Sequence, residues 1–362
     1  MNIVISGYYG SGNGGDEAML YAILAGLREK NSELNIVVIS SNPEETAKKH
    51  SVKSVFWLDY FSIFRELLNA NLLISGGGSL LQNVTSGKSL YYYLSVIAIA
   101  EFLKVPVMLY AQGIGPIHGK YAKKIMKYVG NKASVITVRD EGSIAELESL
   151  SITKPTIECT ADPVLALTVK NKNIGEEILT KANVDMEKRK IGIAVREWKN
   201  LKLYKEALAE SADILRRDLN AEIVYIPMQA KEDVFAAREV SALSKEGGVI
   251  LEGPYNTEEL LSIIASLDLI IGIRLHALIF AAVANVPMVG LSYDPKVGRF
   301  MKSIGDTVAG HIEDLQAETL VKVVKDKWQK LDEIKERTEK LLPPLREKAL
   351  RNIEFAMKLI KE

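Results

Sequence analysis

Short apolar runs alternate with longer amphipathic stretches along most of this chain of 362 residues. The runs are rich in isoleucine, valine and leucine, which is typical of strands buried on both faces of a sheet. The strands predicted in this way are 3–6, 35–40, 72–75, 107–110, 135–138, 190–195, 222–226, 249–251 and 267–273. Most are followed by a predicted helix, at 16–27, 60–69, 89–103, 120–129, 140–150, 203–217, 231–244, 258–266 and 276–284. This alternation predicts parallel βαβ units.

The most informative stretch is 266–292, in which an apolar strand ends and a helix begins around Arg274 and His276. Both residues therefore lie at the carboxyl edge of a sheet, beside the N–H groups and positive dipole of a helix start. We expect an anion to bind there. A membrane span is one alternative, but it would bury Arg274 at a cost of roughly 2.5–3.5 kcal/mol. A purely structural Arg–His turn is the other.

The two halves of the chain repeat a strand, a helix and a Val-Pro strand, as residues 70–76 resemble 267–272 and Val105-Pro106 resembles Val286-Pro287. We therefore expect an α/β fold of two Rossmann-like domains facing across a cleft. Their expected bounds are 1–165 and 166–314. Residues 315–362 are expected to form C-terminal helices, interrupted at Pro343-Pro344. These helices either pack back on the N-terminal domain or touch a membrane, since residues 322–361 hold 12 Lys/Arg against 7 Asp/Glu.

Composition excludes several functions. Lys+Arg and Asp+Glu each number 46, so no overall basic field favours nucleic acid. A single cysteine, Cys159, excludes an internal disulfide and a cysteine-built metal cluster, and the four histidines are scattered. The chain opens directly on a strand, without the pattern of a signal peptide. We expect a cytoplasmic protein without a metal.

The glycine loop at residues 7–15 contains the pattern G-x-G-x-x-G, starting at Gly10. A dinucleotide site would also need an acidic residue about 20 positions on, where the second predicted strand instead ends in Ser40-Ser41-Asn42. A loop that closes on another ligand fits better. Asp16 and Glu17 could then bind sugar hydroxyls, although Asp16 could equally serve only as a helix cap.

Further loops and basic residues fall on the same predicted edge. Glycine loops follow two strands, at 76–78 and 113–115, and Arg139, Arg196 and Arg274 each follow a strand end. Lys296 lies at the next helix start, where a solvated lysine is the alternative. Converging guanidinium groups bind carboxylates and phosphates in a bidentate manner, and an imidazole such as that of His276 exchanges protons near neutrality. The residues alone thus predict a two-domain cleft enzyme for an anionic small molecule.

The motifs together resemble the polysaccharide pyruvyl transferase family, and within it the bacterial branch that acts on secondary cell-wall polymer. They are Gly7-Tyr-Tyr-Gly-Ser-Gly-Asn-Gly-Gly-Asp-Glu-Ala18, Ile74-Ser-Gly-Gly-Gly-Ser-Leu-Leu81, Ala111-Gln-Gly-Ile-Gly-Pro116, Arg139-Asp-Glu141, Ala161-Asp-Pro163 and Arg274-Leu-His276. One departure is Asn83, where an acidic residue is expected in relatives.

The resemblance implies a fold like that of GT-B glycosyltransferases and transfer of pyruvate from phosphoenolpyruvate onto a sugar as a cyclic ketal. The implied acceptor is a lipid-linked disaccharide containing N-acetylmannosamine, whose polymer anchors S-layer homology domains. No cofactor and no metal are implied. The donor would bind the C-terminal domain and the acceptor the N-terminal one, with peripheral membrane contact as a further expectation.

Each candidate residue receives a role from this reading. The expected catalytic residues are His276, Arg139 and Lys296. The expected donor-binding residues are Arg274, Arg196 and Leu275. The expected acceptor-binding residues are Gly10, Asn13, Asp16, Glu17, Gly77, Gly78 and Gln112. A nucleotide-sugar glycosyltransferase of the same two-domain type and a non-catalytic anion or sugar sensor are the alternatives.

Overall fold

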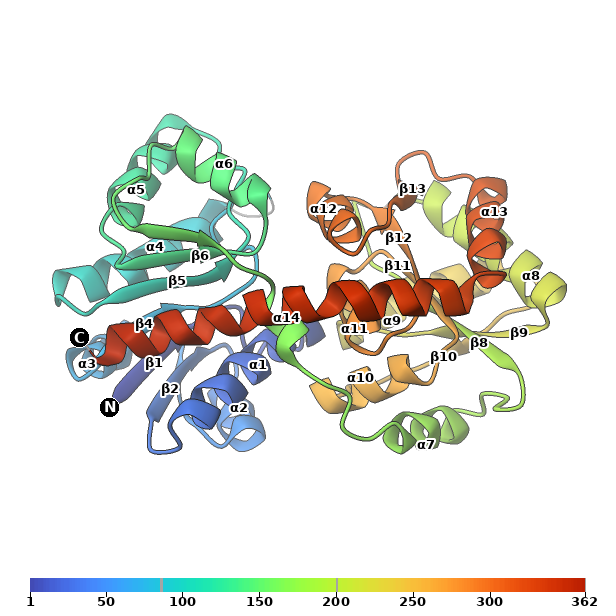
Figure 1. The fold of residues 1–362 in the computed structure, drawn as a ribbon, viewed down its shortest axis with the longest axis horizontal. Helices are drawn as coiled ribbons and strands as arrows, with labels where there is room; N and C mark the ends of the chain where they lie inside the picture. The colour runs from blue at the N-terminus through green and yellow to red at the C-terminus, as the bar shows by residue number, and fades with distance from the viewer. Residues whose placement is uncertain (85–86, 200, 362) are drawn as a thin grey trace. The chain divides into compact units, whose positions relative to one another are not determined.

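The computed structural model describes residues 1–84, 87–199 and 201–361. The chain divides into two compact units (Figure 1). The first comprises Met1–Ala166 together with Pro344–Glu362, and the second comprises Leu167–Pro343.

The first unit contains a seven-stranded parallel sheet in the order β3-β2-β1-β4-β5-β6-β7. The strands are β1 (Asn2–Ser6), β2 (Asn35–Ser40), β3 (Lys53–Phe56), β4 (Leu72–Ser75), β5 (Val107–Gln112), β6 (Val135–Val138) and β7 (Thr156–Cys159). The helices are α1 (Gly14–Lys30), α2 (Pro43–His50), α3 (Tyr60–Leu68), α4 (Gly87–Phe102), α5 (Lys120–Gly130) and α6 (Glu141–Ser149), followed by the 3-10 turn η1 (Pro163–Ala166).

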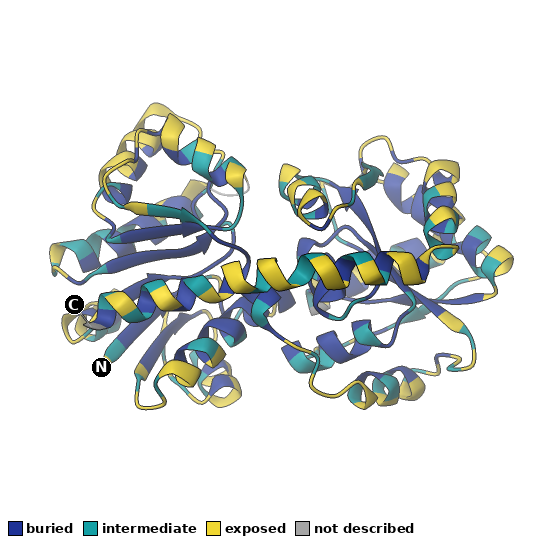
Figure 2. Cartoon of the chain, viewed as in Figure 1, coloured by how far each residue is buried: buried dark blue, intermediate teal, exposed yellow. Residues whose placement is uncertain are grey.

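Apolar side chains bury both faces of this sheet, as its continuous apolar strands predict. On one face, α1 packs with the C-terminal part of α14 (Leu331–Lys361), which contributes Ile353, Ala356 and Ile360. Helices α3 to α6 supply the buried residues on the other face. Figure 2 shows the strands as the most buried part of the unit and the helices with an exposed outer side.

The second unit contains a six-stranded parallel sheet in the order β10-β9-β8-β11-β12-β13. Its strands are β8 (Arg189–Ala194), β9 (Ala221–Tyr225), β10 (Val249–Ile250), β11 (Leu269–Gly272), β12 (Met288–Ser292) and β13 (Val308–His311). Its helices are α7 (Asn173–Lys181), α8 (Leu203–Leu219), α9 (Ala230–Leu243), α10 (Thr257–Ala265), α11 (Leu275–Val283), α12 (Pro295–Ser303) and α13 (Ala317–Trp328), joined by the start of α14.

Both sheets run outward in two directions from one central pair of strands. These pairs are β1–β4 and β8–β11, and the chain order reverses between the two members of each pair. In open α/β sheets the carboxyl ends of such a pair form the crevice in which ligands bind. The predicted α/β fold with two Rossmann-like domains is therefore confirmed, and the fold itself points to residues that follow Ser6, Ser75, Ala194 and Gly272.

The C-terminal segment differs from its prediction. The break expected at Pro343-Pro344 is absent, because α14 runs without interruption through both prolines, and the break falls instead between α13 and α14. Proline lacks an N–H donor, but its φ is compatible with a helix. Each flank is also held by packing in its own unit, through Leu331 and Ile334 on one side and Ala349 and Ile353 on the other. No helix in the described ranges has both the length and the apolar composition of a bilayer span.

Candidate functional site

A buried ion pair marks the carboxyl edge of the second unit. Arg274 follows β11 and is 6% exposed, and its guanidinium contacts the carboxylate of Asp233, which is 1% exposed. Arg274 Nε lies 3.0 Å from Asp233 Oδ2, while Arg274 Nη2 contacts Asp233 Oδ1 and lies 3.3 Å from Gln229 Oε1. Asp233 Oδ2 also accepts from the main-chain N–H groups of Met228 and Gln229 at 3.0 and 2.9 Å. Both partners are therefore fixed in orientation.

Arg196 follows β8, the other member of the central pair. Its Nη1 donates to Tyr293 Oη at 2.7 Å, and its guanidinium carbon lies 4.6 Å from the Tyr293 ring centre and 5.2 Å from that of Trp198. Burial lowers the pKa of Arg196, and the positive charge of Arg274 lowers it further, whereas Tyr293 acts in the opposite direction. The two guanidinium groups are thus close enough to repel each other, and they remain partly removed from water.

Three further predicted residues belong to this edge. Leu275 and His276 open α11, where first-turn N–H groups lack intrahelical acceptors; Leu275 is buried and His276 half-buried. Lys296 lies in the first turn of α12, with its Nζ 5.2 Å from the Tyr293 ring centre and 3.6 Å from Asp294 Oδ2. Asp294 caps the same helix by accepting from the Lys296 N–H at 3.0 Å.

Cations exceed carboxylates by one among the charged residues that surround Arg196 and Arg274 directly. Arg196, Arg274 and Lys296 provide the cations, and Asp233 and Asp294 the neighbouring carboxylates. A partly buried excess of positive charge beside two helix starts favours a small anion with several acceptor oxygens. The half-buried imidazole of His276 lies on the same helix start and could exchange a proton with such a ligand.

In the first unit, hydrogen bonds that Asn13 and Glu17 accept from main-chain N–H groups of the same segment order the glycine loop after β1. Asn13 caps α1 by accepting from the N–H groups of Gly15 and Asp16. Glu17 is buried, and its carboxylate accepts from the Gly10 N–H at 2.8 Å and lies 3.3 Å from His50 Nε2. The contacts with His50, Lys49 and Gly10 lower the pKa of Glu17 despite its burial. Glu17 thus orders the loop through internal contacts.

The second glycine loop, after β4, lies against the first. A Cβ at Gly78 would be 3.2 Å from Asp16 Oδ1, and one at Gly77 would be 2.9 Å from Met19 Sδ. Gln112 at the end of β5 is fully buried, and its Nε2 donates to the carbonyls of Ser75 and Gly76 at 3.0 and 2.6 Å. Of these predicted acceptor residues, Asp16 is half-buried beside the loops, whereas Gln112 is occupied in holding them.

Arg139 belongs to this first unit rather than to the basic edge of the second. Its Nη1 donates to Asp162 Oδ2 at 2.8 Å, and its Nη2 donates to Ser79 Oγ at 3.1 Å. The side chains of this pair are 6% and 4% exposed. Arg139 therefore connects the Arg-Asp-Glu, Ala-Asp-Pro and second glycine motifs to one another.

The contacts of Asn83 explain why an amide, rather than the expected acidic residue, stands at this position. Its Oδ1 accepts from the His118 N–H at 2.8 Å, and its Nδ2 donates to the His118 carbonyl at 2.7 Å. A carboxylate could accept the first hydrogen bond but could not donate the second. The amide thus joins the segment after the second glycine loop to the Gly-Ile-Gly-Pro segment.

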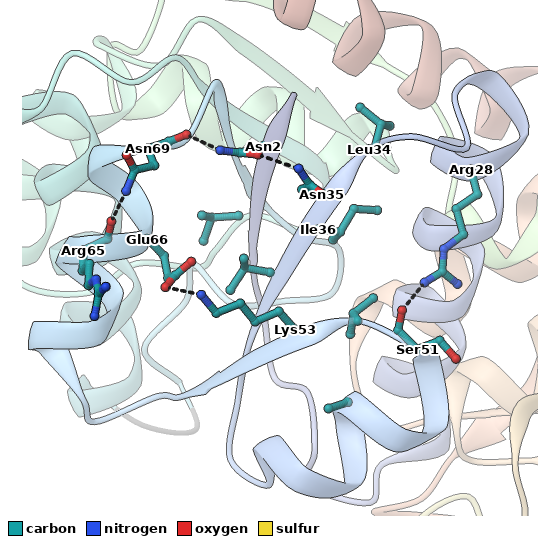
Figure 3. A pocket seen from close by; sticks show the side chains of 14 residues that line it. Asn2, Arg28, Leu34, Asn35, Ile36, Ser51, Lys53, Arg65, Glu66 and Asn69 are labelled. Carbon is teal, nitrogen blue, oxygen red and sulfur yellow. Dashed lines mark hydrogen bonds and ion pairs between the residues drawn. The ribbon is translucent and has the colours of Figure 1, made fainter.

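A concavity of about 740 Å³ lies elsewhere, at the amino end of the strands of the first unit (Figure 3). Its rim includes Asn2 and Asn35 at strand starts and the Lys53–Glu66 ion pair at 2.7 Å. Arg28 at this rim donates to the carbonyls of His50 and Ser51. The concavity contains none of the motif residues and lies at the opposite end of the strands, so it is not part of the candidate site.

Several residues of the two edges were missed by the sequence reasoning. Asp233, Gln229 and Tyr293 surround the predicted arginines, and Asp162 pairs with Arg139. Asp162 stands inside the Ala-Asp-Pro motif, and Tyr293 directly follows the stretch 266–292. Asp233 has no such signal, because an acidic residue in a first helical turn is common. In the described ranges, no group of three or more His, Cys, Asp or Glu side chains could hold a metal ion.

Solved structures share this fold at low sequence identity. The UDP-bound MnaA of S. aureus matches with a TM-score of 0.68 and 14% identity, over 100% of this chain and 98% of that one. A UDP-GlcNAc 2-epimerase from Neisseria meningitidis, bound to UDP-GlcNAc, gives 0.68 and 10%, over 99% and 100%. Anabaena Alr3699/HepE with UDP and glucose gives 0.68 and 11%, over 100% of both chains. No curated protein sequence matches.

These similarities establish a GT-B-like fold of two Rossmann-like domains, here with buried Arg274 and half-buried Arg196 at the central strand ends of one unit. Residues 13–295 match the family described as polysaccharide pyruvyl transferase. Since the match covers well over half of the chain, the protein belongs to that family and is a transferase. The family expectation drawn from the motifs is confirmed at this level.

Proposed function

We propose that this protein transfers pyruvate from phosphoenolpyruvate onto a glycan as a cyclic ketal. The observation that carries the proposal is the pair of partly buried guanidinium groups, Arg196 and Arg274, at the two central strand ends of the second unit. Phosphoenolpyruvate carries a carboxylate and a phosphate on three carbons. Two oriented guanidinium groups beside a helix start match these groups in charge and geometry.

The reaction balances without a redox partner. The enol carbon C3 gains a proton and becomes a methyl group, and C2 becomes electrophilic. Two hydroxyls of one sugar form C–O bonds to C2, and the C2–O bond to phosphate breaks. Of the two hydroxyl protons released, one replaces the proton taken up at C3 and the other leaves with the phosphate. No cofactor is needed for this balance.

His276 supplies the proton to C3 in this proposal, because it lies at the start of α11 directly after the Arg274 end of β11. Lys296 offsets the charge that develops on the departing phosphate, from the neighbouring helix start. The main-chain N–H groups at Leu275 and His276 help to orient the donor. We assign Arg139 a positioning role, since its guanidinium donates to both Asp162 and Ser79 and so joins three motifs of the first unit.

The acceptor in this proposal binds the first unit, at the glycine loops around Gly10, Asn13, Asp16 and Gly78. Glu17 and Gln112 hold those loops in place. We propose a lipid-linked disaccharide containing N-acetylmannosamine, a precursor of the cell-wall polymer that anchors S-layer homology domains. The protein would then act in the cytoplasm, at the membrane face where the lipid-linked precursor is held.

A phosphate-release assay with the purified protein tests this reaction. Phosphoenolpyruvate is supplied with the lipid-linked disaccharide, with a disaccharide lacking a suitable diol, or without an acceptor. Phosphate should appear only in the first mixture, in step with pyruvylated product. If UDP-sugars instead give glycosylated product and phosphoenolpyruvate is not consumed, the nucleotide-sugar alternative holds. Binding of phosphoenolpyruvate without turnover on any acceptor would favour a sensor.

A further inference from the structure

Helix α5 presents an unusual exposed surface. Tyr121, Ile125 and Tyr128 are 82%, 40% and 63% exposed, and their spacing of four and three residues aligns them in one stripe along the helix. The residues that α5 buries against the sheet lie on a neighbouring side and are Ala122, Met126 and Val129. Two largely exposed tyrosines and an isoleucine on one stripe are more than isolated surface apolar residues.

Helix α5 carries lysines beside this stripe and has no acidic residue in its sequence. Lys120, Lys123, Lys124 and Lys127 are all exposed on the same helix. No ion pair joins these four lysines to any residue of the described ranges. The sequence between Glu101 and Asp140 contains no acidic residue at all. The surface of α5 is therefore positively charged as well as aromatic.

The end of α4 extends the same surface. Helix α4 packs against α5, and its last residue, Phe102, is 79% exposed and is followed closely by exposed Lys104. Glu101, which precedes Phe102 in the chain, interacts with Lys132, and burial raises the pKa of Glu101 to about 7. The raised pKa reduces the negative charge that Glu101 contributes near neutrality.

We propose that α5 and the end of α4 dock on an anionic lipid surface. Exposed tyrosine and phenylalanine rings favour the boundary between headgroups and acyl chains, and lysines beside them bind anionic headgroups. A protein partner is a poorer match, because lysine is depleted in protein interfaces. We call the exposed apolar surface formed by Tyr121, Ile125 and Tyr128 of α5 together with Phe102 of α4 the α5 stripe.

The C-terminal helices do not offer an equivalent surface. The apolar residues Ile353 and Ala356 of α14 are buried in the core of the first unit. Several basic residues of the segment are also neutralised: Lys325 pairs with Asp218, and Lys327 and Arg337 both pair with Asp306. The excess of basic residues in 322–361 predicted a membrane contact for this segment. Exposed aromatic rings together with lysines outside ion pairs are stronger evidence for such a contact than excess basic charge alone.

Vesicle co-sedimentation with the full-length protein tests the proposal. The protein should bind vesicles of phosphatidylglycerol and phosphatidylcholine but not vesicles of phosphatidylcholine alone, and binding should fall as salt rises. Tyr121→Ser with Tyr128→Ser, and separately Lys123→Glu with Lys124→Glu and Lys127→Glu, should each weaken binding by at least about tenfold. All these side chains are exposed, so the variants should unfold at the wild-type temperature.

A charge-matched control separates this surface from general electrostatics. Lys322→Glu in α13, Lys330→Glu before α14 and Lys340→Glu in α14 make the same change at exposed positions, and this variant should bind within about twofold of wild type. Equal loss in the control, or no binding of the wild type at low salt, would overturn the proposal. So would single-stranded RNA that binds the α5 stripe more tightly than the vesicles do. Phosphoenolpyruvate is absent throughout, so the result is separate from that for the proposed reaction.

Discussion

Replacing Asp233 tests whether the basic edge of the second unit depends on one buried carboxylate. Asp233 is 1% exposed and accepts from Arg274 and from the main-chain N–H groups of Met228 and Gln229. In Asp233→Ala, the Arg274 guanidinium stays buried without its partner, and two main-chain donors lose their acceptor. We expect the free energy of unfolding to fall by about 3–5 kcal/mol, the usual cost of breaking a buried ion pair.

Asp233→Asn keeps the size of the side chain but not its hydrogen-bonding capacity. An amide has one acceptor oxygen, so its NH₂ group must face either Arg274 or the main-chain N–H groups of 228–229, all of which are donors. We therefore expect Asn to recover less than half of the loss caused by Ala. Arg274 should also become less well oriented, so that the affinity for phosphoenolpyruvate falls by about tenfold or more.

Urea unfolding and calorimetric titration with phosphoenolpyruvate measure both effects. Glu252→Gln is the matched control, because Glu252 pairs with Arg238 at a surface where the side chains are 65% and 60% exposed. That change should cost less than about 1 kcal/mol. The reasoning is refuted if Asp233→Asn unfolds like wild type and binds the donor equally well. A double-mutant cycle with Arg274→Ala should give a coupling energy of at least about 1 kcal/mol.

Three further results are expected. Gly10→Ala should destabilise the protein by about 1–3 kcal/mol more than Gly12→Ala. Both glycines have positive φ, but only a Cβ at Gly10 would meet other atoms, at 2.1 Å from Ser40 Oγ and 2.7 Å from the Asn42 nitrogen. Equal melting temperatures of the two variants would contradict this. The pKa of Glu101 is raised to about 7, so above about pH 4.5 the folded state binds more protons than the unfolded state. The free energy of unfolding should therefore fall by about 1–2 kcal/mol from pH 5 to pH 7, after allowing for partial exposure of the side chain. Glu101→Gln should remove that fall. Arg274→Lys should recover only part of the donor affinity lost in Arg274→Ala, since lysine lacks the planar fork; full recovery by Lys would argue against bidentate contact.

The sequence was informative wherever local pattern decides the structure. The apolar strands that precede Arg196 and Arg274 have clear bounds, so the sequence alone places both arginines at carboxyl ends of strands. Short edge strands with polar residues were missed, as at Lys53–Phe56 and Val308–His311. An edge strand is defined by pairing with its neighbour rather than by its own apolar pattern.

Tertiary contacts account for what the sequence left out of the site. Asp233 reaches Arg274 only because β9 and β11 flank β8 in the sheet, and no local spacing encodes that adjacency. Arg139, expected among the catalytic residues, follows a strand of the first sheet and pairs there with Asp162, a partner that the sequence did not indicate. A strand-end arginine can bind a ligand or hold loops together, and both Arg139 and Arg274 pair with a buried aspartate that lies far from them in the sequence.

The central claim concerns the fate of the three-carbon group, and nuclear magnetic resonance of the product tests it most directly. The protein is incubated with phosphoenolpyruvate and the lipid-linked disaccharide in deuterated water, and the released glycan is examined. We predict a ketal whose methyl group carries one solvent-derived deuterium, because C3 is protonated during transfer. His276→Ala should bind the donor but form no such product. An unmodified glycan, or a sugar transferred from a UDP-sugar under the same conditions, would contradict the account.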